Sequence, residues 1–262
     1  MPAPHRQTDP VRLATFNVLH GRAPADGQVN LGRFATAIRA LDADVLALQE
    51  VDRDQPRSRG ANLTAVAAQA MGAPAHRFVA ALSGTPGTWQ AATGEEQPGT
   101  AGYGIALLSR YPVTDWQVLR LPALPLRVPI WPEGRLPLLV RDEARVALGG
   151  TVQAPGGELR VVTTHLSFLR GWNVLQLRRV MGTVTAAPGP AVLMGDLNLG
   201  PRSVRSVTRL RGLVSQPTFP VDQPRRQLDH VVGRGVQAAA PGEALAMPLS
   251  DHRALVVELA GW

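Results

Sequence analysis

The stretch VRLATFN at residues 11–17 alternates apolar and polar side chains and ends on the polar Asn17. This alternation predicts a buried β-strand with a polar residue at its carboxyl end. From there the apolar spacing predicts a helix, a second strand and a second helix. These elements cover residues 30–41, 44–49 and 62–71. The order strand, helix, strand, helix is typical of an α/β protein.

The middle of the chain shows a different pattern, in which short apolar strands follow one another through tight turns. This pattern indicates antiparallel sheet. The predicted strands here cover residues 103–109, 116–121, 143–152 and 159–164. Further along, helices over residues 172–186 and 201–211 alternate with strands over residues 191–195, 228–232 and 254–259. Two segments rich in Gly, Thr or Pro, residues 83–102 and 122–137, are predicted to be loops, and loops of this length are commonly functional.

Length and composition place further limits on the molecule. The chain has 262 residues, of which 45% are hydrophobic, and this fits one α/β domain over residues 11–262. Residues 1–10 are polar and Pro-rich, and are expected to form a disordered tail that lacks the apolar core of a secretory signal. Cysteine is absent, which excludes disulfides and cysteine-bound zinc, and no apolar run approaches the roughly 18–20 residues of a membrane span. We therefore expect a soluble, cytoplasmic monomer.

All 27 basic residues are arginines, and the formal net charge is +7. Two interpretations of this bias stay open. GC-rich codon usage favours arginine whatever the function, whereas guanidinium groups also bind phosphate oxygens in a bidentate manner. The charge is compatible with a polyanionic substrate but does not establish one.

Asp, Glu, Asn and His side chains recur at the ends of the predicted strands, where α/β proteins usually form their sites. They are Asn17, Glu50, His165, Asp196, Asn198, Asp229, His230, Asp251 and His252. Carboxylate oxygens are hard ligands for Mg²⁺, which prefers few protein carboxylates and several waters. Asn can donate to a phosphate oxygen, and a His held by a carboxylate can take a proton from water. These residue types therefore suit metal-assisted phosphoryl transfer.

Local spacing adds two expectations about where these side chains point. Asp196 and Asn198 are two residues apart and would point the same way on an extended backbone, whereas His230 would point away from Asp229. Asp196 and Asn198 also have a purely structural interpretation as caps of the helix that begins at Pro201. The six histidines show no HExxH motif or close pairing, so Mg²⁺ or Mn²⁺ is expected rather than zinc.

Seven motifs stand in an order typical of one known family. They read LATFNVLHG, LALQEVD, YGIALLSRYP, TTHLSF, GDLNLGP, QLDHVV and SDHRALVVEL. The chain thereby resembles the endonuclease/exonuclease/phosphatase superfamily, which includes pancreatic-type deoxyribonucleases, abasic-site endonucleases, neutral sphingomyelinases and inositol-phosphate phosphatases. The resemblance implies an α/β fold in the form of a four-layer α-β-β-α sandwich, with two mixed β-sheets face to face and helices outside.

The resemblance also implies catalytic roles for individual residues. Asp229 would pair with His252, and Asp196 would orient or deprotonate the attacking water. Asn198 and His165 would contact the scissile phosphoryl oxygens. Either His252 or Asp196 can be the base, and the resemblance leaves this open.

The resemblance also implies residues that bind the metal ion and residues that contact the substrate. Glu50 would bind Mg²⁺, with Asn17 and Asp251 beside it in the metal site. Arg145 is a candidate phosphate-binding residue, with a surface ion pair as the alternative. Tyr103 opens a strand that resembles a family segment near the cleft, with core packing as the alternative.

The implied activity is hydrolysis of a phosphoester bond by in-line attack of an activated water, and three functions are compared. The arginine content favours a nuclease-type phosphodiesterase. However, QEVD and SDHRA depart from the QETK and SDHCP that are typical of abasic-site endonucleases. The alternative is an enzyme for a small-molecule or phospholipid substrate, similar to the sphingomyelinases. A non-catalytic binding module predicts a lost catalytic position, and no matched position is lost. The expected partner is a phosphate-ester substrate, with nucleic acid as one candidate.

Overall fold

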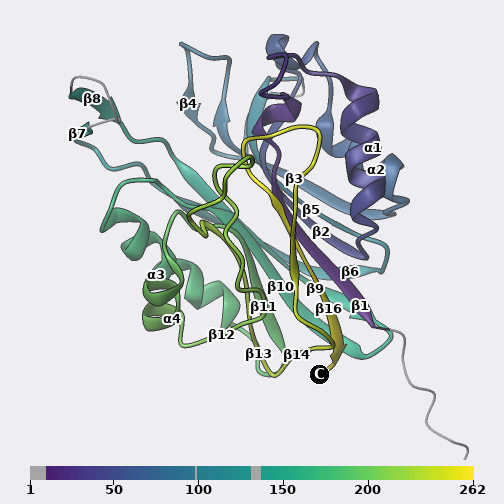
Figure 1. The fold of residues 1–262 in the computed structure, drawn as a ribbon. Coiled ribbons are helices and arrows are strands. Elements are labelled where there is room, and N and C mark those ends of the chain that lie inside the picture. The colour runs from purple at the N-terminus through teal and green to yellow at the C-terminus, as the bar shows by residue number, and fades with distance from the viewer. Residues whose placement is uncertain (1–9, 98, 131–136) are drawn as a thin grey trace, which may run out of the picture.

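Two β-sheets stacked face to face make up the body of the protein (Figure 1). The computed structural model describes residues 10–97, 99–130 and 137–262. The disordered tail predicted over residues 1–10 therefore lies almost entirely outside the described residues, as does Trp131 of the second predicted loop.

The first sheet has the strand order β14-β16-β1-β2-β5-β3-β4, with β15 paired to β16. Only β1 and β2 run parallel, and the other neighbours are antiparallel. Its strands are β1 (Val11–Asn17), β2 (Val45–Arg53), β3 (Ala75–Ser83), β4 (Gln90–Ala91), β5 (Gly102–Ser109), β14 (Gln237–Ala238), β15 (Glu243–Leu245) and β16 (Ala254–Gly261).

The second sheet has the order β12-β13-β11-β10-β9-β6, and here only β10 and β11 run parallel. Its strands are β6 (Val113–Leu121), β9 (Arg145–Ala154), β10 (Gly157–His165), β11 (Ala191–Asp196), β12 (Arg211–Gly212) and β13 (Asp229–Arg234). Between β6 and β9, the strands β7 (Arg127–Ile130) and β8 (Leu138–Arg141) form a separate hairpin that projects from the body (Figure 1).

Helices cover the outer face of each sheet (Figure 1). The helices α1 (Leu31–Leu41) and α2 (Leu63–Met71) lie on the first sheet, and α3 (Trp172–Val184) and α4 (Pro201–Thr208) lie on the second. Two short 3₁₀ turns, η1 (Leu19–Gly21) and η2 (Pro56–Ser58), follow β1 and β2. The four-layer sandwich expected from the sequence is therefore confirmed. Within the described residues no helix is long and apolar enough to cross a membrane.

The helices α1 and α2 begin where the sequence supplies a side-chain cap. Asn30 accepts the Arg33 N–H at 2.9 Å at the start of α1, and Asn62 accepts the Ala65 N–H at 3.1 Å at the start of α2. Gly72 then ends α2 in a left-handed conformation, at φ 69°. These local signals explain why the two helix boundaries were predictable from the sequence.

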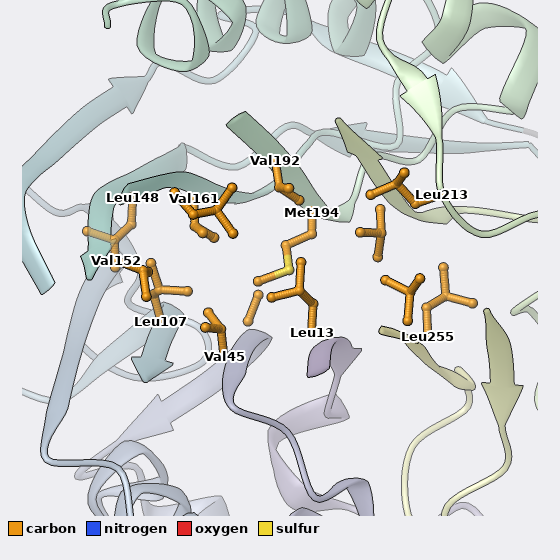
Figure 2. Close-up of a cluster of buried hydrophobic side chains, with 14 of the residues drawn as sticks. Leu13, Val45, Leu107, Leu148, Val152, Val161, Val192, Met194, Leu213 and Leu255 are labelled. Atoms are coloured by element: carbon orange, nitrogen blue, oxygen red, sulfur yellow. The ribbon is translucent and has the colours of Figure 1, made fainter. Parts of the chain in front are cut away.

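The largest buried cluster lies between the two sheets. Figure 2 shows Leu13, Val45 and Leu107 of the first sheet meeting Leu148 and Met194 of the second. The opposite faces of these strands are also buried, against the helices. Because both faces are covered, the central strands read as nearly continuous apolar runs rather than as strict alternation.

Each sheet contains one parallel pair, and these two pairs position the site. β1 and β2 pair up to Asn17 opposite Gln49, and β10 and β11 pair up to His165 opposite Asp196. The carboxyl ends of parallel strands lie at the same edge of a sheet, so each pair brings its terminal polar side chains together. The stacking of the sheets then places the two sets opposite each other.

Three features differ from the sequence prediction. The strand β3 was not predicted, because its Ala-rich sequence has weak strand propensity and it forms by pairing with β5. The segment 122–137, predicted to be irregular, contributes β7, and the segment 83–102 contains the short β4. The β2 strand also does not end at Gln49. It continues to Arg53 after a register shift at Glu50, which has φ 57°.

Gly195 is expected to be essential for the end of β11. It has φ 144°, and a Cβ there would collide with the Thr164 carbonyl oxygen of β10. We expect Gly195→Ala to lower the free energy of unfolding by about 3 kcal/mol or more, measured by urea denaturation. The control is Gly182→Ala inside α3, where no atom lies within 4 Å of the added Cβ. This change should stabilise the protein by about 0.5–1 kcal/mol, and equal effects at both sites would contradict the steric argument.

Candidate active site

A cavity of about 290 Å³ opens at the strand ends where the two parallel pairs meet. Its walls consist of Glu50, Tyr103, Glu143, Arg145, His165, Phe168, Asp196, Asn198, Phe219, Arg226, Leu228 and His252. Seven of the ten predicted site residues are in this wall. A larger cavity of about 830 Å³ lies elsewhere, and none of the predicted site residues lines it. We therefore place the candidate active site in the smaller cavity.

Asp196 is the centre of the polar cluster, and its side chain is buried. Its Oδ2 accepts from the Asn17 amide at 3.1 Å and lies 3.6 Å from His165 Nε2 and 3.8 Å from His252 Nε2. Its Oδ1 accepts the Asn198 N–H at 3.0 Å. Burial, followed by the nearby Asp229, raises the pKa of Asp196 to about 7. A carboxyl with such a pKa can exchange a proton near neutral pH.

Asn17 connects the carboxylates of the two sheets. Its Nδ2 donates to Glu50 Oε1 at 3.0 Å and to Asp196 Oδ2 at 3.1 Å, while its Oδ1 accepts the Leu19 N–H at 3.2 Å. The group that Asn17 presents to the carboxylates is thus an amide N–H₂, which cannot ligate a metal. The placement of Asn17 in the metal site stays a prediction, and in this arrangement its amide N–H₂ is hydrogen-bonded to both carboxylates.

His252 and Asp229 form a buried pair, with 2.8 Å between His252 Nδ1 and Asp229 Oδ2. Burial opposes the charged form of His252, but Asp229, Asp196 and Asp251 together raise its pKa to about 10. The Nδ1 atom therefore donates to Asp229, and Nε2 is the atom that faces Asp196. The Phe219 ring packs against the imidazole, with 5.0 Å between the ring centroids.

His165 is held in the opposite protonation state. Arg145 Nη1, which can only donate, lies 3.5 Å from His165 Nδ1, so Nδ1 accepts and the ring proton is on Nε2. Burial, then the charges of Arg145 and His252, lower the pKa of His165 well below its usual value. His165 therefore presents a neutral N–H toward Asp196. Arg145 is itself buried, and its other terminal nitrogen lies 3.5 Å from Glu143.

Asn198 reaches the site by a different backbone route from the one predicted. β11 ends at Asp196, and Asn198 has φ 49°, so the two residues do not share an extended segment. The expectation of an extended backbone was wrong because the Asp196 carboxylate caps the Asn198 N–H and turns the chain. The Asn198 amide nonetheless lines the cavity. It donates to Leu166 O at 3.0 Å and lies 3.4 Å from His165 Nε2.

Glu50 and Asp251 are the residues that fit a divalent cation. Both are half-buried, and burial raises the pKa of Glu50, with the charge of Asp251 adding to this effect. Because burial disfavours the charged form, a carboxylate in this position gains from a cation beside it. Within the described residues, the tightest acidic and histidine group is instead Asp196, Asp229 and His252. In that group His252 Nδ1 is already hydrogen-bonded to Asp229. Glu50 and Asp251 offer carboxylate oxygens, which Mg²⁺ prefers, so these two residues fit the ion better.

The sequence interpretation missed a cluster of charged and aromatic side chains that packs beside Tyr103, which lines the cavity. Arg57 forms a bidentate ion pair with the buried Asp52, at 2.7 and 2.9 Å. Its guanidinium lies 5.1 Å from the Tyr103 ring centroid and 5.6 Å from that of Trp89. These contacts depend on the pairing of β2 with β5, and no local motif indicates them. His230 behaves as predicted, since it donates to Leu199 O at 2.7 Å and does not line the cavity.

The chain belongs to a class of phosphoester hydrolases, as its match to a family model shows. Residues 14–252 match the sequence model described as the Endonuclease/Exonuclease/phosphatase family, and the chain belongs to that family. Its members are hydrolases of phosphoesters that generally depend on a divalent metal ion.

Solved structures share the fold. An endonuclease/exonuclease/phosphatase from Beutenbergia cavernae DSM 12333 has a TM-score of 0.68 and 25% identity, over 96% of this chain and 71% of that one. The human nocturnin catalytic domain with a bound sulfate anion has a TM-score of 0.62 and 19% identity, over 96% and 94% of the two chains. Sphingomyelinase C from Streptomyces griseocarneus has a TM-score of 0.61 and 16% identity, over 96% and 99%. No curated protein matches the chain significantly.

Replacing Asn17 tests its role as the donor between two carboxylates. Asn17→Asp removes that donor and adds a third carboxylate, so we expect a loss of about 1–3 kcal/mol in the free energy of unfolding near neutral pH. The pKa values of the clustered carboxyls would rise, so the loss should shrink as the pH is lowered from about 8 to about 5. Urea denaturation at several pH values measures both effects.

The matched control for this change is Asn62→Asp. Asn62 acts at the start of α2 only as an acceptor, and a carboxylate keeps that role. We expect a change within about 0.5 kcal/mol there. A similar loss at both positions would show that Asn17 has no special role.

Proposed function

We propose that this protein is a Mg²⁺-dependent phosphodiesterase of the nuclease type, which cleaves its substrate by in-line attack of an activated water. The observation that carries the proposal is the Asp196 carboxylate, which lies among the Asn17 amide and two imidazoles in an arginine-lined cavity. A carboxyl of raised pKa supplies a proton acceptor, and the arginines supply charge for a phosphoryl group.

In this mechanism Glu50 and Asp251 would hold Mg²⁺ or Mn²⁺, and the bound cation would neutralise charge that builds up on the phosphoryl oxygens. Asn17 keeps Glu50 and Asp196 in fixed relative positions through its two hydrogen bonds. Asp196 orients the attacking water and accepts its proton. This arrangement needs little movement of the protein during the reaction.

The phosphoryl oxygens would be bound by hydrogen-bond donors that lie beside Asp196 in the cavity wall. His165 offers a neutral Nε2–H, and Asn198 offers its amide. His252, kept cationic by Asp229, offers a charged N–H. We assign the base to Asp196 rather than to His252, because His252 Nδ1 is committed to Asp229 and Nε2 also carries a proton while the ring is charged.

Arg145 and Tyr103 are proposed to contact the substrate. Arg145 lines the cavity, and its Nε is buried without a hydrogen-bond partner among the described residues. Tyr103 lines the same cavity beside Arg57. A nucleic-acid substrate would find cationic and aromatic groups together in this wall.

A phospholipid substrate is the second candidate, and the β7–β8 hairpin favours it. Leu126, Leu138 and Leu139 are more than half exposed there, at 66%, 57% and 61%. β8 leads within a few residues to Glu143 and Arg145 in the cavity wall. Apolar side chains at the rim of a cleft are suited to contact with a lipid surface.

Asp196→Asn tests the proposed chemistry. We expect hydrolysis of bis-p-nitrophenyl phosphate to fall by about 100-fold or more, because the amide cannot accept the proton of water. Asp222→Asn at an exposed position is the matched control and should keep full activity. Monoester cleavage by the wild type without diester cleavage would indicate a phosphatase. If neither these esters nor nucleic acids nor phospholipids are cleaved, the protein is a binding module.

Glu50→Gln tests the metal site. We expect the Mg²⁺ concentration for half-maximal activity to rise roughly tenfold or more, since the substitution removes a charged ligand. Isothermal titration with Mg²⁺ and Mn²⁺ gives a readout that does not require turnover, and EDTA should abolish hydrolysis by the wild type. The control is Glu243→Gln, at an exposed residue of β15. Unchanged metal affinity in Glu50→Gln would remove Glu50 from the ligand set.

A further inference from the structure

The positive charge of the protein is concentrated in one part of the chain. Residues 166–221 contain seven arginines and a single acidic residue, the buried Asp196. This segment therefore carries a net charge of +6, out of +7 for the whole chain. The rest of the sequence is close to neutral. Codon bias raises the number of arginines everywhere, but it does not remove acidic residues from one segment.

Most of these arginines lie on the helical layer that covers the second sheet, on the opposite side of the molecule from α1 and α2 (Figure 1). Arg178 and Arg179 are on α3, Arg202 and Arg205 are on α4, Arg209 follows α4, and Arg211 is on β12. All six are exposed. Among the described residues, none of the six makes a side-chain hydrogen bond or ion pair, in contrast to the paired Arg33, Arg57 and Arg110.

Three of these arginines surround a hollow. A cavity of about 380 Å³ is lined by Arg205, Arg209, Leu210, Arg211 and Gly212. The neighbouring cavity of about 830 Å³ shares Arg209, Leu210 and Arg211 in its wall and adds Met181 and Trp262. Cationic groups without partners therefore lie beside an apolar and aromatic lining.

The hollow is separate from the candidate active site. Arg211 pairs with Gly233 on β13, whereas Asp196 pairs with Asp229 of the same strand. The two positions on β13 are four residues apart, which corresponds to roughly 13 Å along a strand. No residue lines both the hollow and the active-site cavity.

We propose that this arginine hollow binds the phosphate backbone of single-stranded nucleic acid, outside the catalytic cleft. Guanidinium groups bind phosphate in a bidentate manner, and the adjoining apolar wall offers contact for bases. A lipid surface fits less well, because the apolar Leu210 of this hollow is only 8% exposed and cannot enter a bilayer, whereas the exposed groups are the charged arginines. The site is inferred from charge and shape alone and does not depend on the proposed hydrolysis.

Binding of a fluorescein-labelled single-stranded oligonucleotide, measured by anisotropy in EDTA over a range of salt concentrations, tests the proposal. The test variant is Arg205→Gln/Arg209→Gln/Arg211→Gln. The control, Arg39→Gln/Arg59→Gln/Arg77→Gln, removes the same charge from exposed positions on other elements. Since each phosphate contact contributes about 0.7 to the salt slope, the test variant should lose about 2 from that slope and bind about tenfold more weakly. The control should bind like the wild type.

Thermal melting verifies that both variants fold. Equal weakening in the two variants would mean that net charge alone attracts the probe, and it would overturn the proposal. Unchanged binding in the test variant would overturn it as well. Binding to phosphatidylserine vesicles that is lost in the test variant, without any binding of the oligonucleotide, would assign the surface to membranes instead. Because EDTA is present, none of these results depends on catalysis.

Discussion

The candidate site depends on one amide, that of Asn17, which donates at the same time to Glu50 of the first sheet and to Asp196 of the second. Two carboxylates that face each other from stacked sheets repel, and burial makes this repulsion stronger. The neutral Asn17 amide between the two carboxylates offsets much of their repulsion, and no additional cationic group is needed. Ser250 in turn donates to the Asn17 carbonyl oxygen at 2.6 Å and accepts the His252 N–H at 3.1 Å, so the loop that carries Asp251 and His252 is tied to the same residue.

Gln49 makes a second polar link between the sheets, next to the site along the chain. Its side chain bonds Thr15 within the first sheet at 3.0 Å and Thr163 of the second sheet at 3.3 Å, and all three residues are buried. The apolar core of Leu13, Met194 and their neighbours tolerates sliding of one sheet over the other, since hydrophobic contact has no direction (Figure 2). Directional hydrogen bonds between the sheets would break if one sheet slid over the other. The Gln49 and Asn17 links thus fix the relative position of the two strand ends, and the apolar core supplies the stability.

The sequence allowed much of this arrangement to be predicted, because the determining signals are local. The apolar run before Asn17 and the caps at Asn30 and Gly72 appear within a few residues of the features that they specify. The route of Asn198 into the site was mispredicted, because a turn held by the Asp196 carboxylate replaces extended strand. The register shift at Glu50 and the Arg57 ion pair with Asp52 were not predictable, since both arise where β2 meets β5, a strand far away in the sequence. Contacts between strands that are far apart in the chain are therefore the features that a single sequence predicts least well.

The two histidines beside Asp196 show how neighbouring groups determine the protonation state of an imidazole. His165 and His252 lie at similar distances from the same oxygen, 3.6 and 3.8 Å, and both are buried. Burial and then Arg145 lower the pKa of His165, whereas Asp229 and its neighbours outweigh burial and raise the pKa of His252, so one imidazole is neutral and the other cationic. Asp196 is therefore flanked by one charged and one uncharged N–H donor. In the mechanism proposed above, two cationic rings would pull the pKa of Asp196 down and weaken it as a proton acceptor, whereas two neutral rings would leave a developing phosphoryl charge without a cationic side chain beside Asp196. The asymmetry reconciles the two requirements within one buried cluster.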